Sequence, residues 1–333
     1  MEAVREATDQ PLGTAHRPRR VRKWAARWAS ARALILCAVA IAPPPTAASC
    51  PKSQLAVQVL GSGGPELQDR RASSSYLIWR DGKAQLLFDI GGGAALRFGQ
   101  SGATVSQLDA IFLTHLHVDH AGDLPALVKS SYFEDRRRPL PLFGPTAGGV
   151  FPATTRFVRL LFAAQGAFAY LQDYLDSAAP DSYRLEPHDL TPPEHGLLRI
   201  FEAADVRVFA ARVIHGEVPA LAYRLEVGGL SVAFSGDGDG NNGNLEQLAR
   251  AADLFVAHNA APEGASGAVR ALHMPPSVIG RIAAAARVKR LVISHRMLRT
   301  LGHEQQSTAA IRRSYSGPLT FADDLDCFAV GRP

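Results

Sequence analysis

Short apolar segments that end in polar or glycine-rich turns follow one another from residue 54 onward. Their length and their content of Val, Ile, Leu and Phe are typical of β-strands. The Asp-Gly-Lys sequence at 81–83 is a hairpin signal between two of them. In the first part of the chain the pattern predicts a helix opening near Pro125 and strands over 54–62, 75–80, 84–93 and 107–114.

The second part of the chain alternates strands with helices. Helical periodicity is found over 244–252 and 275–288. Strands are predicted over 206–215, 220–229, 230–238, 253–258 and 290–295. Mixed strands followed by β-α-β alternation predict an α/β fold in which two sheets pack together and helices flank them. No linker interrupts the pattern, so we predict one domain from about residue 51 onward.

The first 49 residues have another pattern. Basic residues, among them Arg17, Arg19 and Lys23, precede an apolar run over 33–42, and small residues follow at 47–49. This is the order of a secretory signal, and a run of ten apolar residues is too short to span a membrane. We therefore predict a signal peptide over 1–49 and a periplasmic or secreted protein.

Charge and cysteine content narrow the range of partners. The formal net charge is +5, but residues 1–49 hold eight of the 36 Lys and Arg and only three of the 31 Asp and Glu. The rest of the chain is near neutral, so no nucleic-acid partner is expected. Cys50 could be the lipid-modified first residue of a lipoprotein, although simple cleavage is the preferred interpretation. Cys50 and Cys327 either pair or stay free, and neither lies in a CxxC zinc motif.

Residues capable of binding metal or moving protons lie at the carboxyl ends of the predicted strands. In α/β folds these ends converge on one rim, where sites are built. The residues are Asp89, His115, His117, Asp119, His120, His215, Asp237, His258 and His295.

The stretch THLHVDHAGD at 114–123 is the densest part of this set. One residue separates His115 from His117, so both imidazoles point to the same side of an extended segment. Asp119 and His120 follow at the turn, and two neighbouring groups of ligands suggest two ions. Histidine and aspartate without thiolate suit Zn²⁺ or a similar divalent metal. A solvated, merely His-rich loop is the alternative, and it is disfavoured because these side chains have no packing use there.

The stretch 114–123 resembles the signature of the metallo-β-lactamase superfamily, and its tRNase Z-like phosphodiesterase and arylsulfatase branch in particular. The resemblance includes LLFDIGGG at 86–93, SGD at 235–237 and the segment 271–295. It implies a four-layer αββα sandwich over 50–333. It also implies that one zinc is bound by His115, His117 and His215, that a second is bound by Asp119, His120 and His295, and that Asp237 bridges both.

Further roles follow from the same resemblance. Asp89 would accept a hydrogen bond from a ligand histidine, or it would only cap the turn at 91–93. Catalytic roles are expected for Asp119 and for His273, which matches the histidine that protonates the leaving group in the tRNase Z-like branch; an ordinary loop histidine is the alternative. His258 is a candidate for holding a ligand side chain in place rather than the metal itself, but His-Asn-Ala replaces the usual His-Glu-Ala at 258–260. His188, His195 and His303 are expected on the surface.

Two zinc ions lower the pKa of a shared water and produce a hydroxide nucleophile. We therefore expect an exported dinuclear zinc hydrolase that cleaves a small phosphodiester, or an aryl phosphate or sulfate ester; a thioester or lactone is a further alternative. Asp237 disfavours lactam hydrolysis. Processing of tRNA 3′ ends is disfavoured because only 225–234 separates two motifs between which tRNA-processing enzymes carry a long arm. A non-catalytic zinc protein is disfavoured by the complete ligand set, and a homodimer stays open.

The segment 150–175 is apolar with helical periodicity and includes Phe157, Phe162, Phe168 and Tyr170. Most of these side chains are expected in the core. The alternative is a lid or subunit contact whose exposed aromatic rings hold an aromatic leaving group.

Overall fold

The structure is a computed structural model that describes residues 50, 53–176 and 183–331. These residues belong to one compact unit, Pro45–Pro333. The predicted signal peptide, 1–49, lies outside the described residues. Within the described ranges, no helix is both long and apolar enough to cross a membrane.

The first β-sheet has seven strands in the order β14-β1-β2-β3-β4-β5-β6. Its strands from β14 to β3 pair antiparallel, and those from β3 to β6 pair parallel. The strands are β1 (Leu55–Gly61), β2 (Ser75–Arg80), β3 (Lys83–Phe88), β4 (Ala110–Phe112), β5 (Leu140–Pro145), β6 (Leu185–Leu190) and β14 (Cys327–Ala329).

The second sheet also has seven strands, in the order β13-β12-β11-β10-β9-β8-β7. Here β10 to β13 pair parallel, whereas β7 to β10 pair antiparallel. The strands are β7 (Leu198–Ala203), β8 (Val206–His215), β9 (Val218–Val227), β10 (Leu230–Phe234), β11 (Leu254–His258), β12 (Leu291–Ser294) and β13 (Leu319–Phe321).

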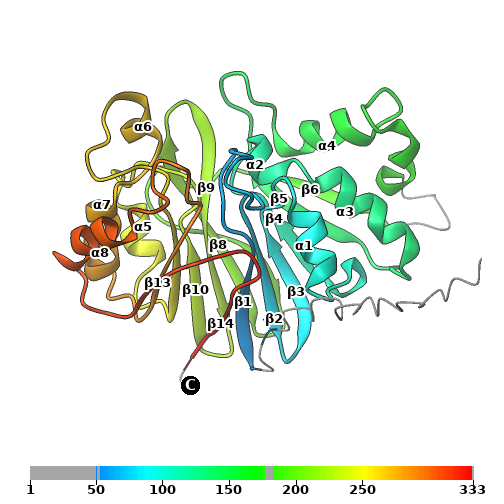
Figure 1. Ribbon diagram of the computed structural model, residues 1–333. Coiled ribbons are helices and arrows are strands. Elements are labelled where there is room, and N and C mark those ends of the chain that lie inside the picture. The colour runs from blue at the N-terminus through cyan, green and yellow to red at the C-terminus, as the bar shows by residue number, and fades with distance from the viewer. Residues whose placement is uncertain (1–49, 51–52, 177–182, 332–333) are drawn as a thin grey trace, which may run out of the picture. The chain divides into compact units, whose positions relative to one another are not determined.

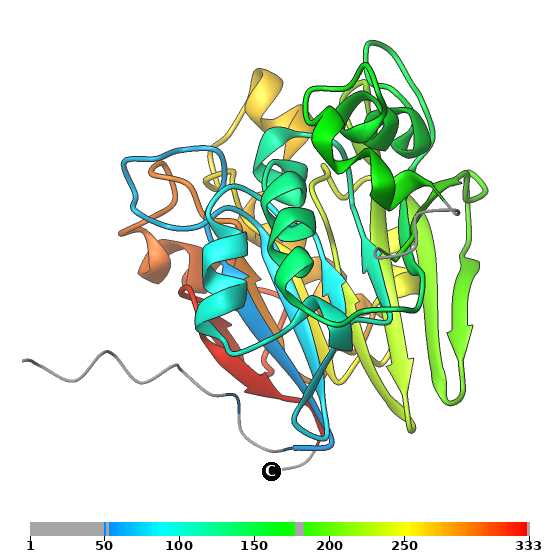
Figure 2. The same ribbon diagram turned by 90° about the vertical axis from the view of Figure 1, so that its right-hand side faces the viewer.

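Helices cover the outer face of each sheet (Figure 1). Figure 2 shows α1 and α3 lying across the first sheet. The helices of the first side are α1 (Ala94–Gln100), α2 (Val118–Ala121), α3 (Leu124–Ser130) and α4 (Thr154–Phe162), with 3-10 turns η1 (Val105–Gln107), η2 (Ser131–Phe133) and η3 (Ala169–Leu175). Those of the second side are α5 (Asn244–Leu248), α6 (Gly267–Leu272), α7 (Pro276–Ala285) and α8 (Glu304–Arg312).

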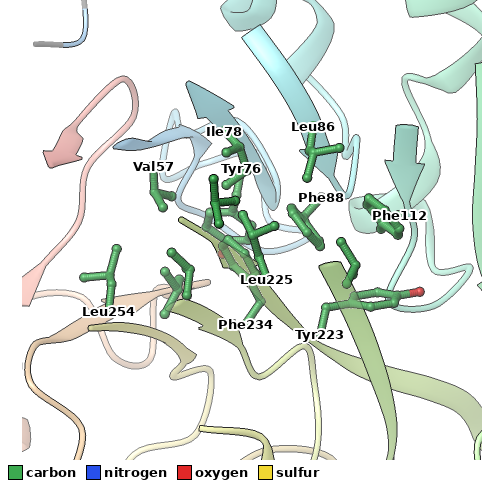
Figure 3. Close-up of a cluster of buried hydrophobic side chains, with 14 of the residues drawn as sticks. Val57, Tyr76, Ile78, Leu86, Phe88, Phe112, Tyr223, Leu225, Phe234 and Leu254 are labelled. Carbon is green, nitrogen blue, oxygen red and sulfur yellow. The ribbon is translucent and has the colours of Figure 1, made fainter. Parts of the chain in front are cut away.

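Three apolar layers hold these elements together. Between the sheets, Phe88 and Phe234 stack with ring centroids 4.5 Å apart, and Figure 3 shows side chains of both sheets meeting there. Strand β1 illustrates the alternation, because Val57 faces this central layer while Ala56 packs under the helices of the first side. A third layer joins the second sheet to its own helices. The four-layer αββα sandwich is confirmed.

Most predicted strands are present, and 75–80 and 206–215 match β2 and β8 at both ends. The strand predicted over 84–93 stops at Phe88, because Asp89 has a left-handed backbone with φ 57°. The helix predicted from Pro125 is α3, and it is separate from the single turn α2 that carries Asp119 and His120. Cys50 and Cys327 form a disulfide. The sequence alone did not decide whether they pair.

Candidate metal centre

The candidate ligands lie where strands of both sheets end. In the first sheet Asp89 follows β3, and His115 follows β4 by three residues. In the second sheet His215 and His258 are the last residues of β8 and β11, and Asp237 and His295 come just after β10 and β12. The four strands of the second sheet run in one direction, so their ends meet at one rim. His188, His195 and His303 are exposed, as expected.

His115, His117 and His215 form one cluster of nitrogen ligands. Their nearest ring nitrogens lie within 4.8 Å of one another. Nε2 of His115 is 3.0 Å from Nδ1 of His117, and the rings of His115 and His215 are 5.0 Å apart. These three side chains can converge on one ion.

Asp119, His120 and His295 form a second cluster beside the first. Oδ2 of Asp119 lies 3.6 Å from Nε2 of His120 and 3.9 Å from Nε2 of His295. These spacings are close to the roughly 3.4 Å between ligand atoms around a tetrahedral zinc with bonds of about 2.0–2.1 Å.

Asp237 joins the two clusters through a single oxygen. Its Oδ2 is 3.2 Å from Nε2 of His295 and 3.6 Å from Nε2 of His120, and it is also 3.9 Å from Nε2 of His215. The preceding Gly236 allows this placement, because its φ is 57° and a Cβ there would lie 2.5 Å from the carbonyl oxygen of Leu221.

Hydrogen bonds to Nδ1 fix the orientation of four histidines and leave Nε2 facing the centre. The carboxylate of Asp89 accepts from His120 at 2.8 Å, and the carbonyl of Leu272 accepts from His215 at 2.8 Å. Such partners select the tautomer that a metal ligand needs. The remaining two contacts are Ser74 Oγ to His295 at 2.7 Å and Thr114 Oγ1 to His115 at 3.1 Å.

The Asp89 carboxylate contacts Thr114 and His120 rather than the glycine turn that follows it. It accepts hydrogen bonds from the backbone N–H and the hydroxyl of Thr114 at 2.7 and 2.8 Å. Asp89 is buried and has positive φ, as does His295 with φ 51°. Strained backbone of this kind at two residues of one site indicates that the surrounding structure holds them in place.

His258 uses both ring nitrogens away from the metal positions. Its Nδ1 is 2.7 Å from Oδ1 of Asp237, and its Nε2 is 2.8 Å from the hydroxyl of Tyr76. Although His258 lies close enough to count among possible ligands, it has no lone pair left to offer. It therefore positions Asp237 so that Oδ2 stays free.

His273 directly follows α6 and lies on the part of the centre that the second sheet forms. Its Nδ1 is 3.7 Å from Oδ2 of Asp237, and its ring is 5.2 Å from that of His215. Burial lowers the pKa of His273 to about 3, and the neighbouring His295 and His215 act in the same direction while Asp237 opposes them. The imidazole is therefore neutral at pH 7 before substrate binds.

The protonation of His115, His117 and Asp237 suits metal binding. Burial lowers the pKa values of His115 and His117, so both keep a free lone pair at neutral pH. Burial opposes charge on Asp237, yet His295 and His120 hold its pKa well below the usual range.

At His120 burial opposes the charge, but Asp89, Asp237 and Asp119 raise the pKa well above the usual value, so a metal ion would displace its proton. Nε2 of His120 and Nε2 of His215 are buried without a hydrogen-bond partner among the described residues. Unsatisfied nitrogens beside a carboxylate fit a cation.

Sequence reasoning missed four groups that orient this centre: the side chains of Ser74, Tyr76 and Thr114 and the carbonyl of Leu272. Thr114 opens the quoted stretch 114–123, so its place in the motif was a usable signal. The others lie far away in the sequence, and no local pattern marks them.

Comparisons with known proteins agree with this geometry. Residues 69–278 match the metallo-beta-lactamase superfamily. The chain is 29% identical to a ribonuclease Z of Mycolicibacterium paratuberculosis over 291 residues, which cover 83% of this chain and 99% of the relative. It is 32% identical to a ribonuclease Z of Mycobacterium bovis over 213 residues, which cover 61% of this chain and 69% of the relative.

Solved structures show the same fold. The short form of human tRNase Z superposes with a TM-score of 0.62 at 21% identity and covers 83% of this chain and all (100%) of its own. The metallo-β-lactamase fold protein YhfI from Bacillus subtilis gives 0.61 at 21% identity, with 82% and 99% covered. With two sheets, this rim of ligands and these relatives, the chain belongs to the tRNase Z-like branch of the metallo-β-lactamase superfamily and is a metal-dependent hydrolase of ester bonds.

Proposed function

We propose that this protein is a dinuclear zinc phosphodiesterase, exported from the cytoplasm, whose substrate is a small phosphodiester. One observation carries the proposal: two clusters of ligand atoms share a single carboxylate oxygen, Oδ2 of Asp237, at 3.2 to 3.9 Å. Ions held by the two clusters would therefore be close neighbours. Histidine and carboxylate ligands without thiolate favour Zn²⁺.

Two bound divalent ions supply a nucleophile from water at neutral pH and polarise a phosphoryl oxygen. The side chains have the task of holding the geometry. Asp119 and Asp237 contribute the negative charge that balances the cations, and His258 keeps Asp237 turned toward both clusters. Asp89 and Ser74 prevent rotation of His120 and His295. The preorganised centre therefore does not reorganise when the phosphorus–oxygen bond breaks.

His273 is the proposed proton donor to the leaving oxygen. Its Nδ1 is turned toward Asp237, which leaves Nε2 to reach a leaving group. Without substrate the imidazole is neutral, because burial lowers its pKa to about 3. A bound phosphodiester brings negative charge close to the ring and raises this pKa, so protonation and substrate binding are coupled. His273 acts as a general acid only in the complex.

RNA 3′-end processing is the second candidate function, and the relatives named ribonuclease Z favour it. The chain has only the tight β9–β10 hairpin where tRNA-processing enzymes were expected to carry an arm. However, the alignment with the Mycolicibacterium relative spans 291 residues and covers 99% of that relative. The relative therefore has no room for a long arm between these two motifs either. The missing arm is therefore weaker evidence against RNA than the sequence alone suggested.

Export is supported by the disulfide between Cys50 and Cys327, because such bonds persist in oxidising compartments. The signal peptide itself lies in the part of the chain that the structure does not describe. Fusion of residues 1–60 to a reporter active only outside the cytoplasm tests this part of the proposal. An inactive reporter would refute export.

The activity is tested on purified, zinc-loaded protein with four substrates: a bis-aryl phosphate, an aryl sulfate, a thioester and a transcript carrying a tRNA with a 3′ trailer. We expect the bis-aryl phosphate to be cleaved fastest, with about two zinc ions per chain by elemental analysis. Faster cleavage of the transcript at one position would favour RNA processing. No cleavage of any phosphodiester by protein that holds two zinc ions would overturn the proposal.

A further inference from the structure

An apolar cavity of about 580 Å³ opens beside the candidate metal centre. Its wall combines residues of α2 and α3, the outer side of α4 and the approach to η3. Only His117, Lys129 and Tyr170 among its lining residues carry a polar side-chain atom. Its size matches that of pockets for small organic ligands, which span about 300–1,000 Å³.

Most of the large apolar residues of this wall are only partly buried, with one side packed against the core and the other facing the cavity. On α4, Val158 and Phe162 are buried under the first sheet, whereas Phe157 and Leu161, one position earlier in each turn, are only half-buried and line the cavity. The segment 150–175 is thus both core and cavity wall. Apolar surface left open in a concave site marks a binding site for an apolar group.

The cavity and the metal centre share one residue, His117. One atom of this ring, Nδ1, faces His115 at 3.0 Å in the first ligand cluster. The same ring, with Leu116 before it, forms part of the cavity wall. A group attached to an ester bond at the centre therefore has this cavity as its neighbour on the side of His117.

Charge in the cavity argues against a polynucleotide. Lys129 is the only charged side chain of the lining, and its ammonium lies 4.1 Å from the ring centroid of Tyr132 and 5.5 Å from that of Phe133. A strand of RNA needs a row of cations for its phosphates along its path. The lining offers one cation and an otherwise apolar surface.

We propose that the cavity beside His117 binds a bulky apolar group, an aryl ring or an alkyl chain, that the ester substrate carries next to its scissile bond. The proposal rests on the hydrolase function proposed above and names the substrate class of that site. The protein would then prefer phosphodiesters with an apolar substituent over those of nucleotides.

The test uses zinc-loaded full-length protein and 4-nitrophenyl phosphodiesters whose second ester group is methyl, phenyl or octyl. We expect kcat/KM to be about tenfold or more higher for the phenyl and octyl esters than for the methyl ester, since burial of one ring gives a factor of this size. Most of the difference should be in KM. Equal kcat/KM values for the three esters would overturn the proposal.

Two variants locate the effect. Ala126→Trp fills the cavity from an exposed position of α3, so the phenyl-to-methyl ratio should fall to near one. Leu160→Ala is the matched control, because Leu160 is 52% exposed on α4 and does not line the cavity; its ratio should equal that of the parent. A ratio unchanged in Ala126→Trp would place the apolar group elsewhere and refute the cavity.

A binding measurement separates this proposal from the proposed function. Phenylphosphonate and methylphosphonate are not hydrolysed, and calorimetry on zinc-loaded protein gives their affinities. We expect phenylphosphonate to bind about tenfold more tightly and Ala126→Trp to remove the difference. If no phosphodiester is cleaved but this preference is present, the phosphodiesterase activity fails and the cavity stands. Equal affinities would refute the cavity whatever the activity.

Discussion

The two sheets supply their ligands in different ways. The first sheet contributes His115, His117, Asp119 and His120 from six consecutive residues, held by β4 and α2. The second sheet contributes single residues from three separate strand ends, and they are His215, Asp237 and His295. The ligands of the first sheet are therefore neighbours in the sequence, whereas those of the second sheet come together only in the folded chain. Activity should depend on the ligands of both sheets, but the hydrogen bonds that orient these ligands differ between the two sheets.

Asp237 is the point at which the two contributions meet, and its loss should have the largest effect. Asp237→Asn removes the negative charge from the oxygen that both clusters share. We therefore expect kcat/KM to fall by about a thousandfold or more and zinc content to drop below two per chain. Asp239→Asn is the matched control, since the Asp239 carboxylate only accepts hydrogen bonds from Asn241. Full activity in Asp237→Asn would mean that the clusters work independently.

His273 differs from the ligands because it acts on the leaving group, and its effect should be the next largest. His273→Ala should lower kcat by about a hundredfold on a phosphodiester with an alkoxide leaving group, with zinc content unchanged. On a 4-nitrophenolate leaving group, which needs no proton, the loss should be much smaller. The same loss on both substrates would contradict a role as proton donor.

The difference between the two sheets also explains what could be predicted from sequence. The strand ends were readable because β2 and β11 are short apolar segments that stop at a polar residue, and because β8 alternates buried apolar residues with exposed ones up to His215. Strands β5 and β6 were not predicted, because each contains proline and β6 is a polar edge strand. Three-residue strands such as β13 and β14 carry too short a pattern to detect.

At the site, every proposed ligand was named from sequence because each lies at a strand end within a recognisable motif. The orienting partners were not, because they depend on tertiary structure. Ser74 meets His295 across 221 residues, and Tyr76 meets His258 across 182. The pairing of the two sheets creates these contacts, and no spacing along the chain encodes them. For 150–175 a lid or subunit contact was only the alternative to a core helix, and a cavity was not predicted, since apolar periodicity alone does not separate a core face from a pocket face.

Orienting contacts give the third test, in which one contact is removed from a ligand of each sheet, His120 of the first and His295 of the second. Asp89→Asn disturbs a buried carboxylate that holds both Thr114 and His120, so zinc affinity should fall by about 10- to 100-fold. Ser74→Ala removes one neutral hydrogen bond to His295 and should cost only about fivefold. Competition with a chromogenic chelator measures both. An equal loss in the two variants would mean that the ligands of the first sheet have no stronger support than those of the second sheet.

The smallest effect is expected at Tyr76, which contacts Asp237 only through His258. Its hydroxyl lies 2.8 Å from Nε2 of His258 and 3.0 Å from Oγ of Ser294. Tyr76→Phe leaves that imidazole nitrogen buried without a partner, so the free energy of unfolding should fall by about 1–2 kcal/mol.

Because His258 then holds Asp237 less firmly, Tyr76→Phe should also lower kcat/KM a few-fold with zinc content unchanged. Tyr223→Phe separates the two effects. The Tyr223 hydroxyl donates to the carbonyl of Leu113 at 2.7 Å in the same apolar layer and, among the described residues, has no hydrogen bond to a candidate ligand. Its loss should therefore reduce stability to a similar degree and leave kcat/KM near the parent value. Equal activities in the two variants would show that Asp237 keeps its place without the contact from Tyr76 through His258.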